Sequence, residues 1–228
     1  MVESSPYAGQ ASDNLVKIFW MINNSNYDQL RKIKGCETLG DLTATPKDIV
    51  FIEKMKTAYG VADDDFYKDS EADIKALKTT YSKIMKKSRG LTHEGKAHLI
   101  IVYCGGHGAT QHEKQIYLLN SAEAKNAMFQ LEFKLRYLVQ DEGTMGRIFA
   151  VFDCCRCRIE GMPGLLETGR GVAENIDDAG DSDEEEICKY FHIQACGPGG
   201  IADADGGFAE KIYNHSLKYS KRNPVGFV

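Results

Sequence analysis

Three apolar runs constrain what this chain can fold into more than any other feature of its sequence. Residues 16–22, 97–103 and 147–152 are nearly continuous in apolar side chains. Such runs are typical of strands that are covered on both faces, as the strands of a parallel sheet are. Between the runs, apolar residues recur every three or four positions, which indicates amphipathic helices. Strands that alternate with helices predict an α/β fold, here a three-layer sandwich with a mostly parallel sheet flanked by helices.

Boundary residues mark the helices between these strands. Thr45 suits an N-cap, Pro46 the first turn, and Gly60 the position after the last turn. Similar patterns predict further helices over residues 73–90, 122–140 and 208–219. Short strands are predicted at residues 66–67, 115–119 and 190–195.

The chain has the length of one domain. Its 228 residues are enough to bury a substantial core, and no internal repeat divides them. We interpret residues 1–14 as a polar N-terminal tail and residues 15–228 as the folded domain. Residues 171–187 interrupt the pattern, because they are acidic and almost free of apolar side chains. They are expected to form a solvated linker.

Charge and hydropathy exclude several classes of partner. The net charge is −5 at pH 7, which argues against nucleic acid or an anionic membrane as the main partner. No apolar run reaches the roughly 18 to 20 residues that a membrane span requires. The first residues have neither the basic start nor the apolar centre of a signal peptide. Together with an odd number of cysteines, seven, this predicts a cytoplasmic (intracellular) protein with reduced thiols.

Reactive side chains follow two of the apolar runs at the point where each strand ends. His107 comes after the second run, within a glycine-rich loop, and Cys155 comes after the third. Because the carboxyl ends of parallel strands share one edge of a sheet, we expect the two side chains to meet there. An imidazole that accepts the proton of a thiol produces a reactive thiolate. We therefore predict His107 as base and Cys155 as nucleophile, with the amides of Gly108 and Cys155 as donors to a developing oxyanion.

The residues around both strand ends resemble the motifs of a known family. The run Tyr103-Cys104-Gly105-Gly106-His107-Gly108 is similar to the catalytic histidine motif of caspase-like peptidases, and Asp153-Cys154-Cys155-Arg156 resembles the Asp-x-Cys-Arg motif of paracaspases and prokaryotic metacaspases. The 48 positions between His107 and Cys155 agree with the roughly 50-residue gap in caspases. Looser matches extend the resemblance over residues 16–219.

The resemblance implies a caspase-like sheet and a function. Its motif selects Cys155 over Cys154 as nucleophile and places Asp153 and Asp48 in the pocket for the residue before the scissile bond. Two carboxylates there favour Arg or Lys, because charge-assisted hydrogen bonds to a guanidinium are strong. The implied function is a cysteine endopeptidase that cleaves a polypeptide substrate after basic residues. Gln194-Ala195-Cys196-Gly197 looks like another caspase signature, but Pro198 breaks it, so we reject Cys196 as nucleophile.

Departures from the family pattern leave a second function open. Gly105 replaces the usual serine, Cys104 beside the histidine is unusual, and Gly199-Gly200 lack the third pocket acid of some relatives. The alternative is a catalytically inactive pseudo-protease that acts as a scaffold or as a subunit of a larger assembly.

No cofactor or metal is predicted. The acids between the two motifs are scattered rather than clustered as in calcium-dependent metacaspases. Zinc bound by Cys104, His107 and the cysteines at 154, 155 and 157 is a weaker interpretation, because adjacent cysteines on a strand diverge and no Cys-x-x-Cys is present.

Overall fold

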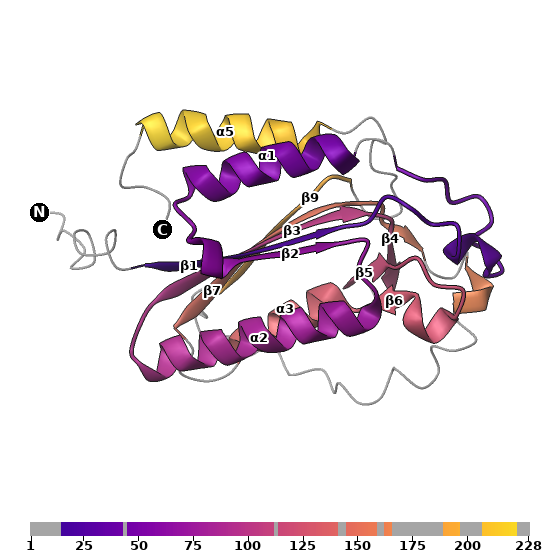
Figure 1. Ribbon diagram of the computed structural model, residues 1–228, viewed down its shortest axis with the longest axis horizontal. Coiled ribbons are helices and arrows are strands. Elements are labelled where there is room, and N and C mark those ends of the chain that lie inside the picture. The colour runs from indigo at the N-terminus through magenta and orange to yellow at the C-terminus, as the bar shows by residue number, and fades with distance from the viewer. Residues whose placement is uncertain are drawn as a thin grey trace, which may run out of the picture.

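The fold consists of three layers around a central sheet. The computed structural model describes residues 15–42, 45–111, 114–140, 145–158, 162–165, 189–196 and 207–222. Helices α1 (Thr45–Ala58) and α5 (Phe208–Arg222) cover one face of the sheet, and α2 (Ile74–His93) and α3 (Leu131–Gln140) cover the other (Figure 1). The predicted tail at 1–14 and the acidic linker at 171–187 lie outside the described residues.

The central sheet has five strands, and every neighbouring pair is parallel. The strands are β1 (Val16–Asn23), β2 (Phe66–Ser70), β3 (His98–Gly106), β7 (Gly146–Cys154) and β9 (Tyr190–Gln194). Their order across the sheet is β2-β1-β3-β7-β9. The predicted α/β three-layer sandwich with a mostly parallel sheet is therefore confirmed.

Side chains of the central strands alternate between two cores. In β1, Trp20 packs into the core beneath α2 and α3, while Phe19 packs into the core beneath α1. In β3, Ile100 and Ile101 divide in the same way. A strand buried on both faces needs apolar residues at every position, which is why these runs are continuous.

Three helix predictions need correction, and the first is that the helix predicted over 208–219 continues to Arg222. The helix predicted over 122–140 begins only at Leu131, because residues 124–126 form a 3-10 turn and Met128–Phe129 form the short strand β6. The helix predicted to end at Gly90 continues to His93. Its start is as expected, since the side chain of Asp73 accepts a hydrogen bond from the amide of Ala76 at 2.7 Å. None of the described helices is both long and apolar enough to cross a membrane.

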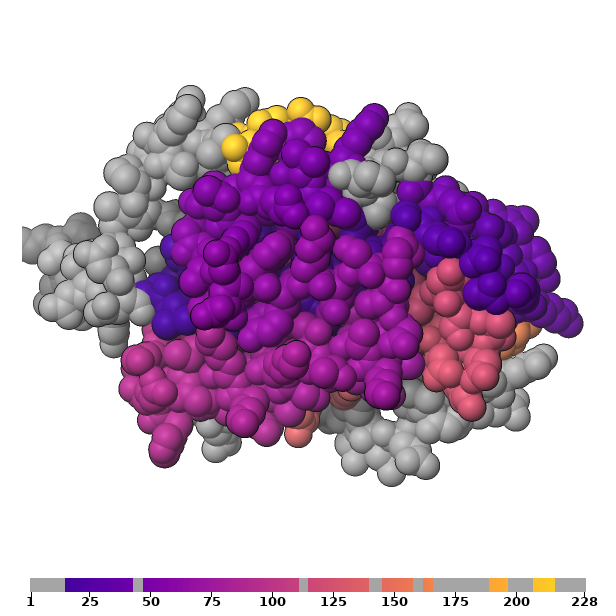
Figure 2. Space-filling model, viewed as in Figure 1, coloured from indigo at the N-terminus to yellow at the C-terminus, as the bar shows by residue number. Residues whose placement is uncertain are grey.

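A second, smaller sheet lies beyond the carboxyl ends of the central strands. It contains β4 (Gly108–Gln111), β5 (Lys114–Leu118), β8 (Cys157–Arg158) and β6, in the order β6-β5-β4-β8. The indigo segment after β1 lies beside the rose-coloured residues of this region in Figure 2, and the amide of Gln29 donates to the side chain of Asn120 at 2.8 Å. This sheet was not predicted as a unit, and it bounds the site.

Candidate active site

Two strand pairings run the backbone segments that carry the predicted nucleophile and base side by side. β3 pairs with β7 up to Gly106 and Cys154. After a short interval the same two chain segments pair again as β4 and β8, where Ala109 lies opposite Cys157. Between the two pairings lie His107 and Gly108 on one segment and Cys155 and Arg156 on the other. The backbones of these two short stretches therefore face each other. The expectation that the two reactive strand ends are neighbours is confirmed.

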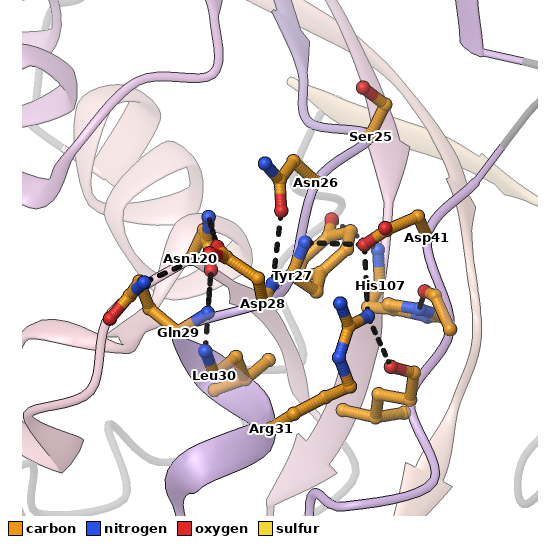
Figure 3. A network of polar contacts seen from close by, with 12 residues as sticks. Ser25, Asn26, Tyr27, Asp28, Gln29, Leu30, Arg31, Asp41, His107 and Asn120 are labelled. Carbon is orange, nitrogen blue, oxygen red and sulfur yellow. Dashed lines mark hydrogen bonds and ion pairs between the residues drawn. The ribbon is translucent and has the colours of Figure 1, made fainter.

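Hydrogen bonds fix His107 at three atoms. Its amide donates to the Tyr27 hydroxyl at 2.8 Å, and its carbonyl accepts from the amide of Leu118 at 3.0 Å. Its ring nitrogen Nε2 lies 2.7 Å from the carbonyl oxygen of Gly40. The Tyr27 ring also packs against the imidazole, with ring centroids 4.4 Å apart (Figure 3). The imidazole therefore has one defined orientation.

The same contacts assign the proton on His107. A carbonyl only accepts hydrogen bonds, so Nε2 carries the proton and Nδ1 keeps its lone pair. Nδ1 makes no hydrogen bond within the described ranges, whereas burial lowers the pKa of the ring. A buried, neutral imidazole with a lone pair available is the form that a general base requires.

A polar network holds Gly40 next to the imidazole. Asp41 accepts hydrogen bonds from the amide of Tyr27 and from the guanidinium of Arg31, both at 2.9 Å. Arg31 also donates to the carbonyl of Leu39 at 3.1 Å. Figure 3 shows that Arg31, Asp41 and Tyr27 gather beside His107. The segment after β1 therefore supplies both the ring contact and the carbonyl that orient the histidine.

Glycines flank His107 because no side chain fits there. A Cβ on Gly106 would lie 2.5 Å from the Tyr27 hydroxyl, and the φ of Gly106 is +149°. A Cβ on Gly108 would lie 2.3 Å from Nε2 of Gln115 and 2.7 Å from the carbonyl oxygen of Cys155. The backbone of the histidine loop thus lies directly against the backbone that carries the predicted nucleophile.

The neighbouring thiols differ in environment. Cys104 and Cys154 are fully buried in the core beneath α2 and α3, and their thiols are hydrogen-bonded to each other. Burial raises the pKa of Cys104 well above its usual value. Cys155 is only partly buried. Of the two adjacent cysteines, Cys155 is therefore the one that solvent reaches.

Asp48 and Asp153 lie close enough to interact. Asp48 is in the first turn of α1 and only 6% exposed. Burial, and then the negative charge of Asp153, raises the pKa of Asp48 to about 6. Asp153, at the end of β7, accepts a hydrogen bond from the Tyr103 hydroxyl at 2.8 Å. Two acids from distant parts of the chain thus converge beside the strand end that carries Cys155.

One oxygen of this acid pair lacks a hydrogen bond. The amide of Gly207 donates to Asp48, but Oδ1 of Asp48 is buried and has no partner in the part of the chain that the structure describes. A buried carboxylate oxygen without a donor is costly. A cation with several N–H groups would satisfy it.

Sequence reasoning missed the residues that orient His107. The sequence patterns assign no role to Tyr27, and they do not reveal Gly40, because a backbone carbonyl leaves no side-chain signal. Gln115, beneath Gly108, was expected only as a strand residue. No group of three His, Cys, Asp or Glu side chains in the described ranges is arranged to hold a metal ion.

Comparison of the sequence with models of known protein families gives no match, and no curated protein matches it either.

Proposed function

We propose that this protein is a cysteine endopeptidase that cleaves polypeptides after Arg or Lys, as its resemblance to the Asp-x-Cys-Arg branch of caspase-like peptidases implies. The observation that carries the proposal is the double pairing of the β3–β4 and β7–β8 segments, because it sets His107 opposite Cys155. The lone pair of His107 Nδ1 supports the same function.

In the proposed reaction, His107 Nδ1 takes the proton of the Cys155 thiol, and the thiolate attacks the scissile carbonyl carbon. The carbonyl oxygen becomes an oxyanion that accepts hydrogen bonds from the amides of Gly108 and Cys155. The imidazolium then gives its proton to the leaving amine, which departs with the carboxyl-terminal part of the substrate. Water, deprotonated by His107, hydrolyses the remaining thioester and releases the enzyme. The carbonyl of Gly40 holds Nε2–H throughout these steps.

The acid pair accounts for the proposed specificity. A guanidinium presents five donors in a planar fork, which matches the carboxylates of Asp48 and Asp153 and the oxygen of Asp48 that lacks a donor. A lysine ammonium satisfies fewer of these acceptors. We therefore expect Arg to be preferred over Lys before the scissile bond.

An intracellular site of action belongs to the same proposal. None of the six described cysteines is in a disulfide, although the thiols of Cys104 and Cys154 are hydrogen-bonded to each other. Free thiols persist in reducing compartments. Protein partners other than the substrate follow only from the alternative function, an inactive scaffold.

The proposal is tested by labelling with an acyloxymethyl ketone peptide that ends in Arg. Its control is the same peptide ending in citrulline, which has the same shape without the charge. We expect one thioether adduct per molecule, on Cys155 by peptide mass spectrometry, formed about 10²-fold faster with Arg than with citrulline. The Cys155→Ala variant should remain unlabelled. Absence of an adduct on folded wild-type protein would reject the peptidase and favour the scaffold.

A further inference from the structure

Gln115 links the two segments that carry the predicted oxyanion donors. This residue of β5 is 1% exposed. Its side-chain nitrogen Nε2 lies 3.1 Å from the carbonyl oxygen of Cys155 and 3.2 Å from that of Ala109, the residue after Gly108. The backbone amide of Gln115 donates to Glu132 at 2.7 Å, which anchors β5 to α3. One carboxamide therefore ties the histidine segment to the cysteine segment.

Cys196 also contacts the backbone on either side of Cys155. Its thiol lies 3.6 Å from the carbonyl oxygen of Cys154, to which it donates, and its sulfur accepts from the amide of Arg156. Each peptide group is planar, so a contact at its oxygen also sets the direction of its N–H. Cys196 thus contacts the peptide group before Cys155 and the one after it. Gln115 contacts the latter from the opposite side.

We propose that Gln115 and Cys196 are positioning residues, which fix the two peptide groups that flank Cys155 and so keep its N–H directed at the forming oxyanion. This inference rests on the proposed function. Its physical basis is that an oxyanion donor is effective only at about 2.7–3.1 Å from the oxygen, so a rotated peptide group loses the interaction. Neither residue touches the reacting atoms.

A purely structural role explains Gln115 less well. Its oxygen Oε1 is buried and has no hydrogen-bond partner among the described residues. Buried polar side chains that serve only stability satisfy their hydrogen bonds, and an apolar residue of the same length would avoid this cost. The side-chain amide of Gln115 can do what an apolar side chain cannot, because its N–H groups hold the carbonyl oxygens of Ala109 and Cys155 in place.

The experiment compares Gln115→Met, which keeps length and loses the donors, with Ser88→Ala. Ser88 is a buried residue hydrogen-bonded to His98 at 2.7 Å, at the other end of the sheet. We expect Gln115→Met to lower kcat for an Arg-containing peptide about 10²-fold while KM stays within twofold. Ser88→Ala should lower the melting temperature and leave kcat unchanged.

Cys196 supplies a rescue test. The hydroxyl of Cys196→Ser still donates and accepts, so this variant should keep kcat, whereas Cys196→Val should lower it. Hydrogen exchange at the amides of Cys155 and Arg156 should accelerate in Gln115→Met and Cys196→Val but not in Ser88→Ala.

The two proposals fail in distinguishable ways. If wild-type protein neither cleaves nor becomes labelled, the peptidase function is rejected. The hydrogen-exchange measurement still decides whether Gln115 and Cys196 fix the peptide groups that flank Cys155. If wild-type protein is active and Gln115→Met retains its kcat with unchanged exchange at Cys155, the positioning role is rejected.

Discussion

Two buried histidines mark the two ends of β3, and they are bonded differently. His98, the first residue of the strand, is 1% exposed, and His107, just after the last residue, is 8% exposed. Burial lowers the pKa of both rings. In His98, however, Nε2 lies 2.7 Å from the Ser88 hydroxyl and Nδ1 lies 3.2 Å from the Lys96 carbonyl. Of the two ring nitrogens of His107, only Nε2 has a hydrogen-bond partner in the described ranges, the carbonyl oxygen of Gly40.

This difference separates a structural histidine from a candidate base. Burial and pKa do not distinguish them, because both rings favour the neutral form. The distinguishing feature is a nitrogen with a lone pair left free, which is useless for stability and necessary for proton transfer. Within the part of the chain that the structure describes, both ring nitrogens at the amino end of β3 have partners, whereas Nδ1 of His107 at the carboxyl end and Oδ1 of Asp48 in α1 have none.

The largest expected effect comes from replacing the two histidines in turn. His107→Asn should lower kcat/KM for an Arg-containing peptide about 10³-fold, because the base is lost. His98→Asn should leave kcat/KM per folded molecule unchanged and lower the free energy of unfolding by about 2 kcal/mol, because buried hydrogen bonds are lost. Peptide cleavage and urea unfolding of both variants measure these effects. Equal activity losses would remove the distinction between the two ends.

Asp48→Asn should lower kcat/KM for an Arg substrate about 10²-fold, because one carboxylate of the pocket is lost. The same change should stabilise the free protein at high pH. The folded-state pKa of Asp48, about 6, exceeds its ordinary value of 3.8. Its favourable contribution is therefore complete below about pH 4 and is lost as the pH rises through 6.

We compare the free energy of unfolding of Asp48→Asn with that of the wild type at two pH values. The difference between the two proteins should be about 2 kcal/mol more in favour of Asp48→Asn at pH 8 than at pH 4. The control is Asp63→Asn, since Asp63 is exposed and its pKa is lowered by Lys56 rather than raised. A gain in Asp63→Asn as large as in Asp48→Asn would contradict the assignment. Urea unfolding at both pH values measures the difference.

A smaller effect concerns the stability of the protein at acid pH, through His98 at the amino end of β3. The folded-state pKa of His98 is depressed, so its contribution is present above pH 6.5 and is lost as the pH falls below that value. In the Asp48→Asn background, which removes an opposing titration, the free energy of unfolding should fall as the pH is lowered from about 7.5 to about 5. Adding His98→Gln should remove its part of this dependence and leave that of His107 and His192, whose pKa values burial also lowers, and an unchanged slope would contradict it.

The smallest effect is expected at Gly40. A Cβ at this position would meet no atom within 4 Å. Because Gly40→Ala keeps the carbonyl that contacts His107, it should keep kcat within about twofold and the free energy of unfolding within about 0.5 kcal/mol. A large loss of kcat in the folded variant would show that Gly40 contributes more to the site than its carbonyl oxygen.

The central sheet could be predicted because its apolar runs are continuous, and the candidate site because reactive residues follow two of those runs. Asp48 was identified through a motif, and the structure brings it next to Asp153. The small sheet was missed because β6 and β8 have two residues each, too few for a periodic pattern. The helix predicted over 122–140 began too early, because the apolar spacing continues through Met128, which lies in strand β6. Gly40 acts through a backbone atom, which no side-chain pattern reveals.

The most direct test of the account is the rate at which iodoacetamide alkylates Cys155 as a function of pH, followed by mass spectrometry in wild type and His107→Asn. A paired imidazole should make Cys155 reactive well below the ordinary thiol pKa of about 8.5, and His107→Asn should return the midpoint to about that value. Identical profiles in the two proteins would contradict the claim that these residues form a dyad.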